Sequence, residues 1–120
     1  MVTTVGNFNN LVSDLPLNAR INFVINEAVI YINTIVYSQY NNQITITTST
    51  INNGNHQYLY SITHIIRNSN VNNNVGIVVV YHGGNYEIDI VDTSFLHDGI
   101  IRFHLVRISH PSVQNSRLLN

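Results

Sequence analysis

The sequence predicts an all-β domain, an antiparallel β-sandwich that is jelly-roll-like or similar, with about seven to eight strands and a short N-terminal helix. From residue 20 onward, β-branched and aromatic residues dominate, and these residues favour the pleated surface of a sheet. Clusters of Asn, Gly and Ser interrupt them at the spacing of short antiparallel strands. The length of 120 residues fits one core. We therefore expect a single β-sandwich domain over residues 1–120, with the segments 1–19 and 109–120 as candidates for extended arms.

Apolar residues one helical turn apart, with Asn7 before them and Pro16 after them, predict a short helix over residues 8–15. The strands are expected over 20–25, 28–37, 43–50, 57–66, 75–82, 85–91 and 100–108. The segment 24–36 also fits a helical stripe, but its many Ile, Val, Tyr and Thr residues favour a strand. No internal repeat is evident in the sequence.

The best local signal is the pair Gly83-Gly84, which separates two β-type runs. Two glycines can take the positive φ angles of a tight turn, so the pair predicts a β-hairpin. That turn would place Tyr81 opposite Tyr86. One face of the hairpin would then belong to the core, and it carries Ile77, Val79, Tyr81, Tyr86, Ile88 and Ile90.

The other face of the hairpin and the last strand supply the most polar side chains, which are His82, Glu87, Asp89, Arg102 and His104. If the strands are neighbours, Arg102 and His104 would lie beside the two carboxylates. Two histidines and a carboxylate are typical ligands of zinc, iron or manganese. The spacing matches no compact motif such as His-Glu-x-x-His. We therefore expect a solvated or arginine-paired sheet face with no bound metal and no cofactor.

Enzyme motifs are absent from the sequence. Without cysteine, disulfides, thiolate catalysis and zinc-finger ligation are excluded. The sequence contains no Gly-x-Ser-x-Gly elbow, no phosphate-binding loop and no Gly-x-Gly-x-x-Gly. A non-enzymatic protein is the expectation.

Charge is scarce, with 9% charged residues and a formal net charge of −1. All 5 basic residues are arginines, and they form no basic stripe, so a nucleic-acid partner is not expected. Apolar runs are too short for a membrane span, and the first residues lack the pattern of a secretory signal. Amides and hydroxyls would cover the surface, because asparagine occurs about 20 times and lysine never. Such a surface favours an extracellular or virion-associated location.

Several expected strands are apolar on both faces, and such strands need a second covering layer. A second copy of the chain would provide it, through an interface built on Tyr31, Tyr37, Tyr58 and Tyr60. The leading hypothesis is a structural or self-assembling subunit of virion, appendage or crystal-forming type that forms a homo-oligomer. The alternative is a lectin-like module that binds a glycan or a receptor through tyrosine and asparagine side chains.

Overall fold

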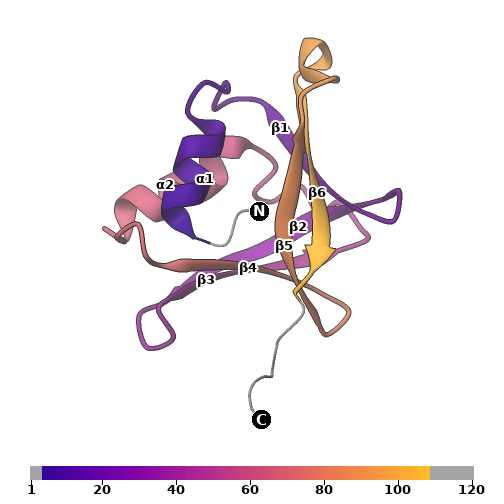
Figure 1. The fold of residues 1–120 in the computed structure, drawn as a ribbon. Helices are drawn as coiled ribbons and strands as arrows, with labels where there is room; N and C mark the ends of the chain where they lie inside the picture. The colour runs from indigo at the N-terminus through magenta and orange to yellow at the C-terminus, as the bar shows by residue number, and fades with distance from the viewer. Residues whose placement is uncertain (1–3, 109–120) are drawn as a thin grey trace.

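The computed structural model describes residues 4–108 and shows six strands closed into a barrel, with two helices lying side by side against it (Figure 1). Its elements are α1 (Val5–Val12), β1 (Arg20–Ile25), β2 (Ala28–Ser38), β3 (Gln43–Ser49), α2 (Leu59–Asn68), β4 (Gly76–Tyr81), β5 (Gly84–Asp92), the 3₁₀ turn η1 (Leu96–Asp98) and β6 (Ile100–Arg107). Residues 4–19 include α1, which packs on the core, and residues 109–120 lie outside the described part of the chain.

Each strand pairs with its neighbours in sequence, and β1 pairs with β6 to close the barrel. Four of the pairings are antiparallel, whereas β3–β4 and β1–β6 are parallel. The helix α2 is part of the long connection that a parallel β3–β4 pair needs. The predicted antiparallel sandwich of seven to eight strands is therefore wrong. Alternation along one strand shows which side chains face the core, but it does not show whether the neighbouring strand is parallel.

The expected strand over 57–66 is the helix α2. Its buried residues Leu59, Ile62 and Ile66 recur every three or four positions, which is helical spacing. This segment is rich in Ile, Thr and Tyr, which have high strand propensity. Burial of one helical face against the barrel overrides that propensity.

The N-terminal helix is present but lies three residues earlier than the expected range 8–15. Thr4 caps it, because its hydroxyl accepts a hydrogen bond from the Asn7 N–H at 3.2 Å. The helix buries Val5, Phe8 and Val12. The ring of Phe8 lies 6.1 Å from that of Phe103 in the barrel, so the helix completes the core.

The barrel consists of two structurally equivalent halves, a first half (residues 4–49) and a second half (residues 58–107), each with a helix followed by three strands. Adding 56 to the residue numbers of β1 gives those of β4. The register shift between Ile32 and Thr34 in β2 recurs, again 56 residues later, between Ile88 and Ile90 in β5. The fold is thus duplicated, although the sequence shows no repeat.

The two halves interlock through the starts of their helices. The Val5 N–H donates to the Val75 carbonyl at 2.8 Å, and the Leu59 N–H donates to the Ala19 carbonyl at 2.9 Å. Val75 and Ala19 directly precede β4 and β1. Each helix is therefore anchored to the first strand of the other half.

The predicted β4–β5 hairpin exists, but its turn residues are His82 and Gly83, with φ angles of 48° and 75°. Tyr81 lies opposite Gly84 rather than Tyr86, so the register differs by two residues. Ile90 was expected on the core face but is 57% exposed, because the register shift after Ile88 turns it outward. Gly84 is a buried strand residue, and a Cβ there would lie 3.1 Å from the Tyr86 ring.

Substitution of Gly83 tests this turn most directly. Gly83→Val places a β-branched side chain in the left-handed region and should lower the free energy of unfolding by roughly 1–2 kcal/mol. Gly83→Asn should cost less, because asparagine tolerates this conformation. Urea unfolding of the two variants measures the difference, and equal stability of both variants and the parent protein would contradict the turn assignment.

Candidate functional site

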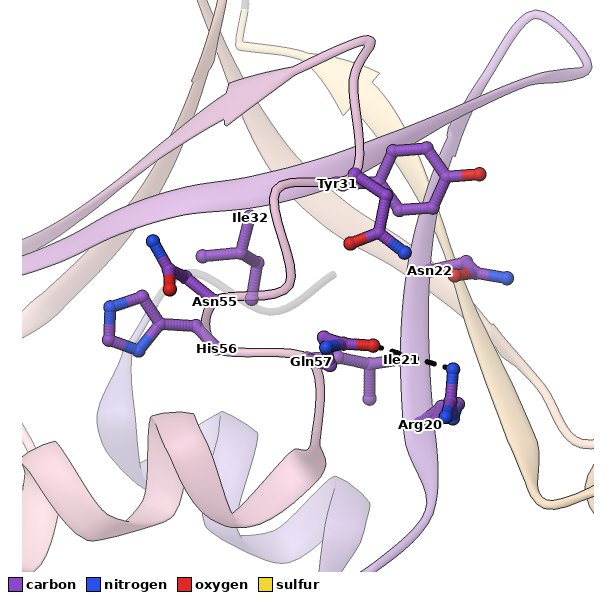
Figure 2. A pocket seen from close by; sticks show the side chains of 9 residues that line it. Arg20, Ile21, Asn22, Tyr31, Ile32, Asn55, His56 and Gln57 are labelled. Atoms are coloured by element: carbon purple, nitrogen blue, oxygen red, sulfur yellow. Dashed lines mark hydrogen bonds between the residues drawn. The ribbon is translucent and has the colours of Figure 1, made fainter.

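Three of the four predicted interface tyrosines gather around Arg20, at the start of β1. The rings of Tyr58 and Tyr60 stack with centroids 5.1 Å apart and planes 10° apart. The Arg20 guanidinium carbon lies 5.7 Å from the centre of the Tyr58 ring. Tyr31, on β2, lines the same hollow as Arg20 (Figure 2). Tyr37 does not join this group, because it is half-buried against the barrel core.

We call this surface the Arg20 site. It is defined by Arg20, Asn22, Tyr31, Asn52, Asn55, His56, Gln57, Tyr58 and Tyr60. Figure 2 shows Asn55, His56 and Gln57 on the segment before α2, with Gln57 reaching toward Arg20 on β1. The Arg20 guanidinium donates to Gln57 Oε1 at 3.4 Å. The hollow encloses only about 30 Å³, room for one or two waters, so a larger ligand would rest on this surface.

The loop that carries these amides is held in place by its own side chains. Asn52 Oδ1 accepts from the Gly54 N–H, and Asn53 Oδ1 accepts from the Asn55 N–H, each at 2.9 Å. Gln57 Nε2 donates to the Gly54 carbonyl at 2.7 Å. Asparagine commonly bonds its own turn in this way. The Asn-rich composition thus orders the loop through bonds within the loop itself.

A second hollow adjoins the first and shares His56 with it. It measures about 250 Å³ and is lined by His56, Tyr60, Ser61, His64 and Ile65. Tyr60 stacks on Tyr58, lines this second hollow together with Ile65, and is 47% exposed. The Arg20 site therefore continues past Tyr60 onto the outer side of α2.

The structure spreads out the predicted polar side chains of the hairpin and the last strand. Arg102 lies opposite Asp92, and His104 lies opposite Ile90. Glu87 lies opposite Val106, and Asp89 is exposed at the register shift in β5. His82 is in the hairpin turn.

Asp92, rather than Glu87 or Asp89, is the carboxylate that lies beside Arg102 and His104. The Ser94 hydroxyl and the Ser94 N–H donate to its carboxylate at 2.6 and 2.9 Å and hold the pKa of Asp92 below its usual value. His104 Nε2, 3.5 Å from the carboxylate, lowers the pKa further. Within residues 4–108, no cluster of three or more His, Cys, Asp or Glu side chains is arranged to hold a metal ion.

Comparison with known proteins gives no matching family model, no matching curated protein and no matching solved structure. In the described part of the chain, no helix has both the length and the apolar character needed to cross a membrane.

Proposed function

We propose that this protein is a non-enzymatic, lectin-like binding domain that holds a neutral carbohydrate on the Arg20 site. The observation that carries the proposal is the half-exposed Tyr60 ring, stacked on Tyr58 beside a hollow lined by amides. Leu59, between the two tyrosines, is fully buried and anchors the backbone that carries both rings.

The chemistry of this surface suits a sugar. An aromatic ring offers flat apolar area for the C–H face of a pyranose. Asn22, Asn55 and Gln57 supply amide groups that both donate and accept, as hydroxyl groups require. Arg20 adds donors and carries the one permanent charge among the residues that define the site. A neutral glycan satisfies these groups without burying a second charge.

A glycan array followed by NMR titration tests this proposal. Tyr60→Ala should weaken binding roughly two- to tenfold, because an aromatic contact contributes about 0.5–1.5 kcal/mol. Tyr40→Ala is the matched control, since Tyr40 is 98% exposed in the β2–β3 turn, away from the site. The absence of glycan binding by the parent protein, or equal losses in both variants, would contradict the proposal.

A second candidate function, a self-assembling structural subunit of virion, appendage or crystal-forming type, is favoured by the outer face of β2, β3 and β4. Alternation with the buried residues of these strands points Thr34, Val36, Thr45, Thr47, Val78 and Val80 outward. None of these side chains is ionised. The equivalent outer face of the second half and β1 carries Asp92, Arg102 and His104. A partner copy on the first face would bury no unpaired charge.

Sedimentation analysis tests self-association. A stable dimer buries about 800 Å² per partner, and Val36→Asp would place a charge without a partner in that contact. This variant should dissociate the assembly, whereas Ile90→Asp should not. The two positions match because Val36 is 55% exposed on β2 and Ile90 is 57% exposed on the equivalent strand β5. A monomeric parent protein at high concentration would contradict this second candidate.

A further inference from the structure

The C-terminal ends of the two helices border a groove of about 540 Å³ that is separate from the Arg20 site. The helices lie side by side in Figure 1. For four of the five groove residues of the first half, adding 54 to the number gives a groove residue of the second half, as for Val12 and Ile66 or Leu17 and Val71. The groove therefore runs between equivalent elements of the two halves.

Five of the ten residues that line the groove are apolar, and the other five, Asn9, Ser13, Thr63, Arg67 and Asn70, are polar. Val12 and Ile66 are 5% and 7% exposed and join the main core. Leu15 and Val71 are half-buried beside them, and Leu17 is 45% exposed. An alkyl chain lying here would cover apolar surface that is now in contact with water.

Arg67 is the one ionised side chain among the described residues that line the groove. It forms no ion pair within residues 4–108, although Asp14 lies in the turn that follows α1. The last carbonyls of α2 already accept hydrogen bonds from the N–H groups of Ser69, Asn70 and Val71. The guanidinium is therefore available to a ligand at the edge of the groove.

We propose that this groove binds a single-chain anionic amphiphile, a medium-chain fatty acid carboxylate. The alkyl chain would lie on the apolar residues of the groove, and the carboxylate would pair with Arg67 in the two-pronged geometry that guanidinium favours. The volume lies within the range of about 300–1,000 Å³ for small-molecule sites. The opposite signs of the arginine and the carboxylate select this occupant over a neutral or cationic amphiphile.

Titration of the full ¹⁵N-labelled chain with sodium decanoate, below its micelle concentration, tests the proposal. Saturable shifts should map to the groove. Arg67→Gln should weaken decanoate binding roughly tenfold and leave decanol binding unchanged, because only the carboxylate loses its partner. Leu17→Asn should weaken both ligands. Arg107→Gln is the matched control, since it removes a positive charge from β6, away from the groove.

Arg67→Lys keeps the charge and should retain most of the decanoate affinity, which separates loss of charge from a general disturbance of α2. The proposal is overturned if decanoate causes no saturable shifts, if the shifts map to the barrel wall, or if Arg67→Gln binds decanoate as the parent protein does. These outcomes leave glycan binding at the Arg20 site untouched, because the two sites share no residue.

Discussion

The fold depends on the reciprocal anchoring of each helix to the first strand of the other half, through the bonds Val5 N–H to Val75 and Leu59 N–H to Ala19. Anchoring of α2 brings the chain back after β3 so that β4 can start beside it in parallel. The same arrangement lets β1 pair in parallel with β6. Closure then leaves no free sheet edge, which removes the usual template for uncontrolled strand pairing.

Different side chains at the two equivalent anchors explain why the Arg20 site is not repeated in the other half. Leu59 bonds to Ala19, and Tyr58, the residue before Leu59, forms an antiparallel β-bridge with Arg20. At the equivalent place in the other half, Thr4 bridges to Gly76, so neither the ring nor the guanidinium is present. Equivalent backbone positions in the two halves thus carry different side chains. The outer faces differ in the same way, because the face of β2–β4 is uncharged and the face of β5 and β6 is charged.

Local structure was largely predictable, because alternation and turn residues mark the ranges of all six strands. The pairing of distant strands was not, since a strand pattern carries no information on its partner. The hairpin register was missed because His82 adopts a positive φ that glycine was expected to take. The tyrosines stand out in the sequence as a predicted interface, and this role stays a prediction, whereas Arg20 and Gln57 come to lie near them only through the folded chain.

NMR couplings transmitted across hydrogen bonds test the interlock of the two halves most directly. The fold predicts a coupling from the Val5 amide nitrogen to the Val75 carbonyl carbon, and a second from Leu59 to Ala19. Both couplings should appear in the unmodified full chain. The absence of both, with these two amides bonded within their own halves instead, would contradict the interlocked barrel.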